Sequence, residues 1–531
     1  MSSDDETPLL RRPGVAGSSS KLQVKDYFAG VAAVIMVILG ITAIAVICAY
    51  QTLISYEYGV VLDAGSTHTE LMVYRWSKDH VIHGTGLVEQ IGLCTNKGGS
   101  ISSYVTKNPG LAGSSLQSCI DSTAKKLVPS FQQSETPIYL GATAGMRLVE
   151  ERNKDASRKI MESVRQTLRS SPFRFTDDNA RIISGDEEGV SSWVTVNYAM
   201  GKLIYREMSP NGSESTAHLY GALDMGGAST QITFSPNKNE VVPSKSLHQI
   251  KAYGRNYQLY THSYLCYGKR EAERRYMASL IFNKALVQNQ TIDDPCGQIG
   301  LSQTRSIKYL TQPPCVKMRL IPGVSAVTFN GTSNLTQCIK QVQKLFNFTQ
   351  CSSKERCSFN GVYQPSTEGI PYMAFSSFYY VISDLNLTAT EKANISLGRF
   401  KEAADEICSQ TLAQVTHGAS PSKIAVLRAT CFDAQYIYTL LSKGYHIQDN
   451  STQVKFQNMV NKRSLGWALG FMINATNLIP NEEPEYRVKS EAFLAVVLVG
   501  AVLIGLGILL LIMTTRRVID RKRLTTGGLA I

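Results

Sequence analysis

Two turns of similar composition carry the residues best suited to chemistry. In residues 60–69 and 222–231 an apolar strand ends in an aspartate, Asp63 or Asp224, and is followed by glycines and hydroxyl residues. A carboxylate can orient the water shell of a metal ion, while N–H and O–H groups donate to phosphate oxygens. One such turn alone is usually an ordinary hairpin. Two copies 161 residues apart predict two similar lobes that face each other across a nucleotide.

Two further stretches end a strand with residues that could act on phosphate or water. In residues 137–148 a strand and a small-residue turn precede a helical pattern, which places Thr143 and Arg147 near a helix N-terminus, where anions are favoured. In residues 180–193 a strand ends in glycine and adjacent acids that include Glu188. Both patterns also suit an ordinary helix start. Because the second follows a buried strand, as the aspartate turns do, we expect one of its acids to act on a water molecule.

Length, charge and missing motifs narrow the function classes. At 531 residues the chain exceeds one ordinary domain, which agrees with two lobes. The formal net charge is +12, but the basic residues are scattered, and the cluster at 268–275 is interleaved with glutamates as on a solvated helix face. No nucleic-acid partner is expected. The sequence has no G-x-S-x-G motif and no H-E-x-x-H motif, so covalent serine chemistry and zinc chemistry have no support. It also lacks the P-loop motif of many nucleotide-binding proteins.

Two segments are apolar enough to cross a membrane. Residues 28–50 and 492–513 are uncharged, and each exceeds the roughly 20 residues that span a ~30 Å hydrocarbon core. The first is too long, and begins too far into the chain, for a cleaved signal peptide. Lysines and arginines precede the first span and follow the second, so residues 1–27 and 514–531 are expected to be cytoplasmic tails. The intervening chain is then extracellular or lumenal.

Cysteines and glycosylation sequons agree with that placement. Cys48 lies in the first span, and the other ten cysteines predict five disulfides in an oxidising compartment. A metal site is not favoured, because no C-x-x-C pair occurs. These ten are Cys94, Cys119, Cys266, Cys296, Cys315, Cys338, Cys351, Cys357, Cys408 and Cys431. Nine sequons, all between the spans, predict glycosylation at Asn211, Asn289, Asn330, Asn334, Asn347, Asn386, Asn394, Asn450 and Asn474.

Five motifs then match one protein family in the family's own order. They are residues 61–69, 140–147, 183–189, 222–231 and 466–470. On these motifs the chain resembles the ecto-nucleoside triphosphate diphosphohydrolases, the CD39-like apyrases, and in particular their cell-surface members with two transmembrane helices. The resemblance covers the whole region between the spans. It implies an α/β fold of two RNase H-like lobes, as in actin and Hsp70, around a central nucleotide cleft. Lobe I would comprise 51–184, completed by 461–488, and lobe II would comprise 185–460.

The resemblance also implies roles for individual residues. Glu188 would deprotonate the attacking water, which Ser229 and Gln231 would position. Asp63 and Asp224 would hold a Ca²⁺ or Mg²⁺ ion through its water shell. Phosphate contacts are implied for Ser66, Thr67, His68, Thr143, Arg147, Gly226, Gly227 and Ala228, and nucleobase contacts for Tyr380 and Arg428.

The family's disulfide pattern implies the pairs Cys94–Cys119, Cys266–Cys315, Cys296–Cys338, Cys351–Cys357 and Cys408–Cys431. Two positions depart from the family's motifs. Asp186 stands where relatives usually carry glutamine, which changes the charge beside the metal site. Thr67 stands where many carry serine, which keeps the hydroxyl group.

We therefore expect a hydrolase that uses a divalent cation and an activated water. It would convert extracellular nucleoside tri- and diphosphates (ATP, ADP, UTP and UDP) to monophosphates and phosphate, and so control purinergic signalling at the plasma membrane. Two alternatives stay open. Residues 5–10 have the form of an acidic dileucine sorting signal, which favours a lumenal endolysosomal nucleotidase. A non-catalytic nucleotide-binding membrane glycoprotein would lack the base or the water-positioning serine, and this sequence has both. The two spans also offer a surface for a homo-oligomer.

Overall fold

The computed structural model divides into two units, residues 1–55 with 482–531 and residues 56–481. The residues that it describes are 16–52, 56–78, 81–204, 219–282, 284–288, 290–319, 322–350, 356–385, 387, 395–477 and 490–526. Several predicted features lie outside these residues, namely the dileucine-like stretch 5–10, Cys351, Asn211, Asn289, Asn386 and Asn394. The other five sequon asparagines are all exposed.

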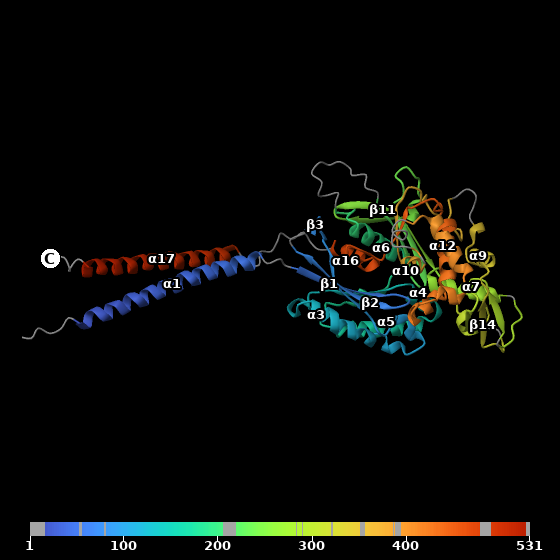
Figure 1. Ribbon diagram of the computed structural model, residues 1–531, viewed down its shortest axis with the longest axis horizontal. Helices are drawn as coiled ribbons and strands as arrows, with labels where there is room; N and C mark the ends of the chain where they lie inside the picture. The colour runs from blue at the N-terminus through green and yellow to red at the C-terminus, as the bar shows by residue number, and fades with distance from the viewer. Residues whose placement is uncertain are drawn as a thin grey trace, which may run out of the picture. The chain divides into compact units, whose positions relative to one another are not determined.

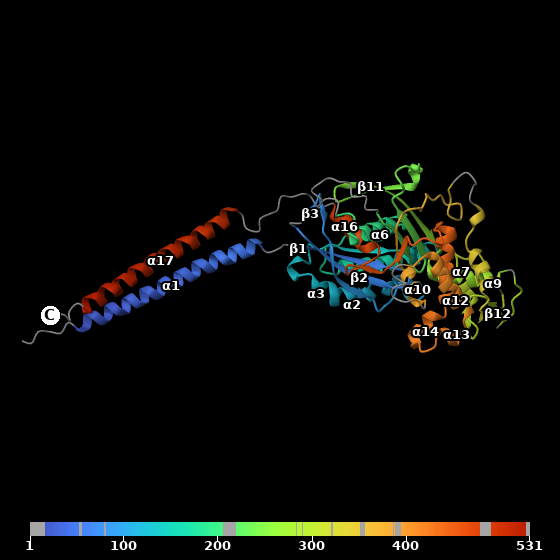
Figure 2. The same ribbon diagram turned by 45° about the horizontal axis from the view of Figure 1, so that its top comes forward.

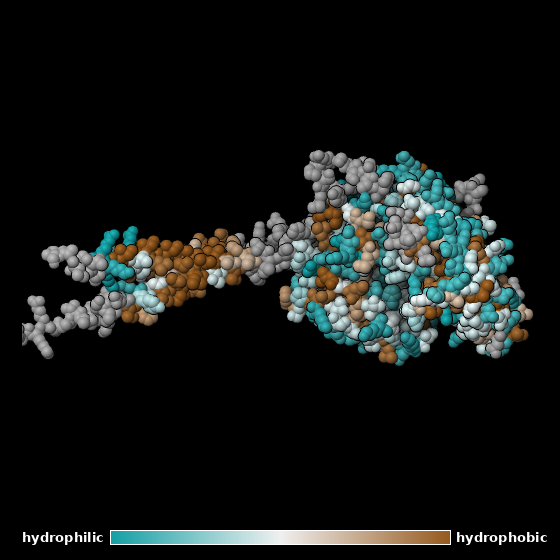
Figure 3. Space-filling model, in the orientation of Figure 1, coloured by the Kyte–Doolittle hydropathy of each residue, from teal (hydrophilic) through white to brown (hydrophobic). Residues whose placement is uncertain are grey.

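The first unit is a pair of apolar helices, α1 (Ala16–Thr52) and α17 (Ser490–Thr526). Each contains a stretch long and apolar enough to cross a membrane, Val24–Ala49 and Glu491–Arg523, and both helices extend beyond the spans predicted from hydropathy. The helices pack side by side (Figures 1 and 2) with a largely apolar surface (Figure 3). A Cβ atom added at Gly40 would lie only 2.6 Å from the carbonyl oxygen of Gly500, so the two backbones approach closely.

The second unit is built on two mixed sheets of matching topology. The first has the strand order β5-β2-β1-β6-β7, and the second has the order β10-β11-β9-β8-β15-β16. In each, a central strand pairs antiparallel with the next strand in the chain and parallel with a later one: β1 with β2 and β6, and β8 with β9 and β15. The strands of the first sheet are β1 (Tyr56–Ala64), β2 (Thr69–Ser77), β5 (Glu89–Thr95), β6 (Ile138–Ala142) and β7 (Ala180–Ile182). Those of the second are β8 (Gly221–Met225), β9 (Ser229–Phe234), β10 (Leu247–Ala252), β11 (Arg255–Leu265), β15 (Tyr372–Ser376) and β16 (Val454–Phe456).

The two aspartates occupy equivalent places in these sheets. Asp63 lies on β1 opposite Glu70 of β2, and Asp224 lies on β8 opposite Gln231 of β9. The apolar residues before each aspartate are buried, as expected for a central strand that is covered on both faces. The prediction of two similar α/β halves, each with an aspartate near the end of a central strand, is confirmed.

Two helices meet back to back between the sheets, α6 (Gly185–Ala199) and α16 (Trp467–Thr476). α6 packs on β8, β9 and β11, and α16 packs on β1, β2 and β4 (Thr85–Gly86). Their contact is close because a Cβ atom at Gly470 would overlap the carbonyl oxygen of Ser191. The Gly470 N–H also donates to Thr195 Oγ1 at 2.8 Å.

The remaining elements cover the sheets and extend the second one. Beside the first sheet lie α2 (Gln117–Cys119), α3 (Lys125–Leu127), α4 (Ala144–Arg152) and α5 (Lys154–Arg169). Beyond the second lie α7 (Lys269–Ile281), α8 (Ile307–Leu310), α9 (Leu335–Gln343), α10 (Ser377–Asp384), α12 (Leu397–Ser409), α13 (Leu412–Val415), α14 (Pro421–Leu427) and α15 (Thr430–Thr439). A three-stranded sheet joins β12 (Thr291–Asp294), β14 (Ala326–Gly331) and β13 (Ser302–Ser306), and two short ladders pair β3 (Val81–Ile82) with β4 and β17 (Met459–Val460) with β18 (Arg463–Ser464).

Four of the five disulfides implied by the resemblance are present. They are Cys94–Cys119, Cys266–Cys315, Cys296–Cys338 and Cys408–Cys431. Cys296–Cys338 joins the segment after β12 to α9, and Cys408–Cys431 joins α12 to α15, and all four cysteines lie in the large core of the second sheet. The fifth pair includes Cys351 and so falls outside the described residues.

Candidate active site

The two aspartate turns face each other at close range. A Cβ atom added at Gly227 would lie 2.8 Å from Ser66 Oγ and 2.8 Å from Thr67 Cγ2. Arg270, at the start of α7, donates from Nη1 to the carbonyl oxygen of Ser66 at 3.0 Å. The turn after β8 and the turn after β1 are therefore in contact, as the paired motifs predict.

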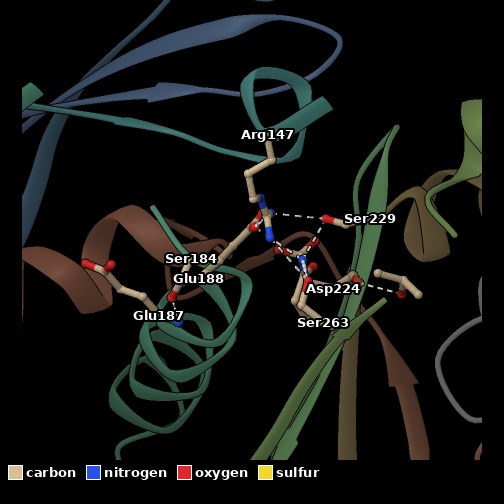
Figure 4. A network of polar contacts seen from close by, with 9 residues as sticks. Arg147, Ser184, Glu187, Glu188, Asp224, Ser229 and Ser263 are labelled. Atoms are coloured by element: carbon tan, nitrogen blue, oxygen red, sulfur yellow. Dashed lines mark hydrogen bonds and ion pairs between the residues drawn. The ribbon is translucent and has the colours of Figure 1, made fainter. Parts of the chain in front are cut away.

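Glu188 lies in the first turn of α6, between the two sheets. The helix begins at Gly185, and the Ser184 side chain caps it by accepting a hydrogen bond from the Glu187 N–H at 3.1 Å. Glu188 is only 7% exposed and forms an ion pair with Arg147 of α4 (Figure 4). Arg147 therefore connects the first half of the unit to the buried acid.

Gln231 is the centre of a polar network beside this ion pair. Its Nε2 atom lies 2.7 Å from Ser229 Oγ, 3.2 Å from Glu188 Oε2 and 2.9 Å from Ser263 Oγ. Arg147 Nη2 also donates to Ser229 Oγ at 3.4 Å (Figure 4). The structure thus brings the three residues predicted to be catalytic, Glu188, Ser229 and Gln231, into one hydrogen-bonded group.

Two buried carboxylates, Glu188 and Asp224, and the half-buried Asp63 belong to this group, and within the described part of the chain their one ion pair is that of Glu188 with Arg147. Burial raises the pKa of Asp63 well above its ordinary value, and the negative charges of Glu188 and Asp224 raise it further. Burial, followed by the charge of Glu188, raises the pKa of Asp224 to about 7. Burial also raises the pKa of Glu188, although Arg147 acts in the opposite direction. The site therefore has an excess of negative charge when its acids are ionised.

This arrangement suits a divalent cation. Within the described part of the chain, the buried Oδ1 atom of Asp63 has no hydrogen-bond partner. Carboxylate oxygens and water are the ligands that Ca²⁺ and Mg²⁺ prefer, and a cation would neutralise the excess charge of Asp63 and Asp224. These two residues therefore fit the predicted role of holding a hydrated metal ion.

The predicted phosphate-binding residues line the two turns and the start of α4. Ser66 and Thr143 are buried, and the Thr143 N–H donates to the carbonyl oxygen of Ala64 at 3.1 Å, which ties α4 to the first turn. In the second turn, the Gly226 N–H donates to the carbonyl oxygen of Ser229 at 3.0 Å, so this N–H group is already hydrogen-bonded within the turn. Ala228 is buried next to it.

His68 is placed differently from the buried members of this group. Its side chain is 54% exposed, with Nδ1 2.9 Å from Thr67 Oγ1 and Nε2 3.7 Å from Glu70 Oε1. It therefore lies at the solvent-facing edge of the first turn.

Comparison with known proteins assigns the chain to a family. The model of the GDA1/CD39 (nucleoside phosphatase) family matches residues 51–491. The chain belongs to this family. Ectonucleoside triphosphate diphosphohydrolase 3 of Mus musculus is 38% identical over 437 residues, which cover 81% of this chain and 80% of the relative. Ectonucleoside triphosphate diphosphohydrolase 8 of Gallus gallus is 39% identical over 433 residues, which cover 81% of this chain and 85% of the relative.

A solved structure shares the fold of this GDA1/CD39 protein. The crystal structure of nucleoside triphosphate hydrolases from Neospora caninum matches it with a TM-score of 0.55 at 15% identity, over 80% of this chain and 93% of that chain. The similarity agrees with the two-lobed α/β class predicted from the sequence.

The two predicted nucleobase residues of this GDA1/CD39 chain come from separate segments. Tyr380 of α10 is 56% exposed, and its hydroxyl oxygen accepts a hydrogen bond from Asn458 Nδ2 at 3.0 Å. Arg428 follows α14 and is exposed. Among the described residues, no hydrogen bond or ion pair joins either side chain to Glu188, so their role stays a prediction.

Two residues of the site were not predicted from the sequence. Ser263 lies on β11 directly opposite Gln231, near the end of a strand whose sequence contains no aspartate or glutamate. Trp467 is buried at the start of α16, packs against Gly141, and its indole partly lowers the pKa of Asp63. Its motif, 466–470, is one of the five family motifs, but no role in the site was predicted for the tryptophan.

Asp186, which departs from the family pattern, lies outside the buried acid group. It is about half exposed, and its Oδ2 atom is 3.6 Å from His248 Nε2 on β10. The extra carboxylate therefore lies near a side chain of the second sheet and away from the buried acids.

Proposed function

We propose that this chain hydrolyses nucleoside tri- and diphosphates with a water activated by Glu188. The observation that carries the proposal is the buried group in which Glu188, Ser229 and Gln231 lie together beside the contacting aspartate turns. The relatives named above are ectonucleoside triphosphate diphosphohydrolases, and family membership supports a phosphoanhydride hydrolase.

In the proposed mechanism, Glu188 accepts the proton of the attacking water. Its raised pKa makes it a stronger base than an ordinary carboxylate. Ser229 and Gln231 hold that water in line with the terminal phosphorus atom. Asp63 and Asp224 would hold Ca²⁺ or Mg²⁺ through water, and the cation supplies charge neutralisation for the phosphate oxygens.

The phosphate chain is proposed to lie between the two turns. Hydroxyl and backbone N–H groups would donate to its oxygens, as in other sites that stabilise developing negative charge. The proposed donors are Ser66, Thr67, His68, Thr143, Arg147, Gly227 and Ala228. Gly226 would contribute by shaping the turn, because its N–H already donates to Ser229 O. The nucleobase would stack on Tyr380, with Arg428 as its basic neighbour.

The two apolar helices support anchoring in a membrane. We propose that the anchored protein faces the extracellular medium at the plasma membrane, with both termini in the cytoplasm and with lobes formed by 51–184 plus 461–488 and by 185–460. An endolysosomal membrane is the second candidate location, because of the dileucine-like residues 5–10. Surface biotinylation of intact cells distinguishes the two locations.

Glu188→Gln tests the proposed base. Loss of a positioned general base is expected to lower the rate of phosphate release from ATP and ADP by about 10²- to 10⁴-fold. Glu187→Gln is the matched control, because Glu187 is the adjacent acid of α6 and pairs on the surface with Arg181.

Both variants should remain folded, which their unfolding temperatures check. A Glu188→Gln protein with the parent's rate would refute the assignment of the base. Chelation by EDTA should abolish phosphate release, and added Ca²⁺ or Mg²⁺ should restore it. Nucleotide binding without hydrolysis by the parent would instead support the non-catalytic alternative.

A further inference from the structure

Ser263 lies beside the proposed base but has no place in the mechanism above. On β11 it is the direct cross-strand partner of Gln231 on β9, so the two side chains share one face of the sheet. That face packs against α6, and a Cβ atom at Gly185 would overlap the Ser263 side chain. The hydroxyl group is therefore confined between the strand and the first turn of the helix that carries Glu188.

The side-chain amide of Gln231 has fewer hydrogen atoms to donate than it has oxygen atoms within hydrogen-bond distance. Nε2 carries two hydrogen atoms. It has three oxygen neighbours, at 2.7 Å (Ser229), 2.9 Å (Ser263) and 3.2 Å (Glu188). The two shorter contacts use both hydrogen atoms, so the contact to Glu188 is the weakest of the three.

Arg147 divides its donors in a similar way. Its Nη2 atom contacts both Glu188 and Ser229, while Nη1 donates to Ser263 Oγ at 3.5 Å (Figure 4). Ser263 is thus an acceptor for both of the groups that also donate to the Glu188 carboxylate.

We propose that Ser263 is a positioning residue for the base: its hydroxyl oxygen accepts N–H groups of Gln231 and Arg147 that would otherwise turn to Glu188. The inference rests on the proposed role of Glu188 as the base. By drawing these donors away, Ser263 keeps the carboxylate available to accept a proton from water. Removing the hydroxyl group lets both donors bind Glu188 more strongly, which stabilises its ionised form and makes it a weaker base.

The other charges around Glu188 do not involve Ser263. Asp63 of β1 and Asp224 of β8 are the nearby acids on the two central strands, and the charge of Glu188 raises the pKa of both. On its own helix, Asp186 pairs with His248 and Glu187 pairs with Arg181. A change at Ser263 therefore acts on Glu188 through the two donors already named.

The test compares Ser263→Ala with Thr261→Val in the detergent-solubilised full chain. Thr261 lies two residues away on β11, faces α6 in the same way, and its hydroxyl forms a 2.6 Å contact with Thr233. Thr261→Val removes a hydroxyl group of the same strand without touching Gln231 or Arg147. Both positions adjoin His262, whose pKa is lowered by burial, so an effect transmitted by that histidine would appear in both variants.

For Ser263→Ala we expect kcat for ATP to fall about 2- to 12-fold, the range that corresponds to one neutral hydrogen bond. The acid limb of the kcat–pH profile should move to lower pH, while KM stays within about twofold of the parent, since a base that acts on water is used after the nucleotide has bound. Thr261→Val should keep the parent's kcat and pH profile.

Three results would overturn the inference. The first is a Ser263→Ala protein with the parent's kcat. The second is an acid limb that stays in place or moves to higher pH. The third is a loss of kcat that Thr261→Val reproduces together with the same drop in unfolding temperature, which would make the hydroxyl group merely structural. A parent that releases no phosphate from ATP or ADP would instead refute the proposed function, and this inference with it.

Discussion

One added methyl group at Gly227 is expected to separate the two aspartate turns and slow hydrolysis. The new Cβ atom would lie 2.8 Å from Ser66 Oγ and 2.8 Å from Thr67 Cγ2. Ordinary contacts between such atoms lie near 3.5–4.0 Å, so the turns must part by roughly 1 Å. A misplacement of about 1 Å can lower a rate about 10²-fold. The expected loss in kcat/KM for ATP and ADP is therefore about 100-fold, or about 2.7 kcal/mol of transition-state stabilisation.

Gly226→Ala is the matched comparison, since it adds the same methyl group one residue earlier in the same turn. There the nearest atom is Ser229 O at 3.6 Å, an ordinary contact, and the N–H that donates to Ser229 is kept. The assay is initial phosphate release by the full chain over a range of nucleotide and cation concentrations, with unfolding temperatures measured in parallel. Equal losses in the two variants, or parent-like activity of Gly227→Ala, would refute the close approach of the turns as the cause.

Two further predictions concern stability. Burial raises the pKa of Asp224 in the folded state to about 7, from an ordinary value of 3.8. With the metal ion removed by a chelator, Asp224 is therefore protonated in the folded state at pH values where it is ionised in the unfolded state. The free energy of unfolding should then fall by up to about 4 kcal/mol as pH rises from about 4 to about 7. Asp224→Asn should flatten the dependence of unfolding temperature on pH between 4 and 7, and equal slopes would contradict this. Gly470→Ala places a methyl group against Ser191 O and should cost about 1–3 kcal/mol in thermal unfolding. Gly466→Ala, with no atom within 4 Å of its Cβ, should shift the unfolding temperature less; equal shifts would argue against close packing of α6 on α16.

The sequence predicts those parts of the site that a local pattern determines. Asp63 and Asp224 could be found because a strand, an aspartate and a glycine turn are contiguous in the chain. Glu188 could be found because an acid at the start of a helix follows a buried strand. The fold class followed from the distance between the two turns and from the family motifs.

Contacts between distant strands and helices could not be predicted in the same way. Ser263 reaches the site through its register against Gln231, which depends on the pairing of β11 with β9. The ion pair of Arg147 with Glu188 depends on how α4 and α6 meet across the two sheets. Helix ends differ for another reason: hydropathy detects only the apolar part of a span, whereas α1 begins twelve residues earlier, at Ala16, through polar residues that hydropathy does not register.

The two sheets share a topology but differ in the residue that pairs with each aspartate. Asp63 pairs with Glu70 across the first hairpin, and Asp224 pairs with Gln231 across the second. Gln231 lies 3.2 Å from the Glu188 carboxylate, where an acid like Glu70 would repel it. The amide at this position therefore allows a buried carboxylate, the proposed base, to lie beside the second turn.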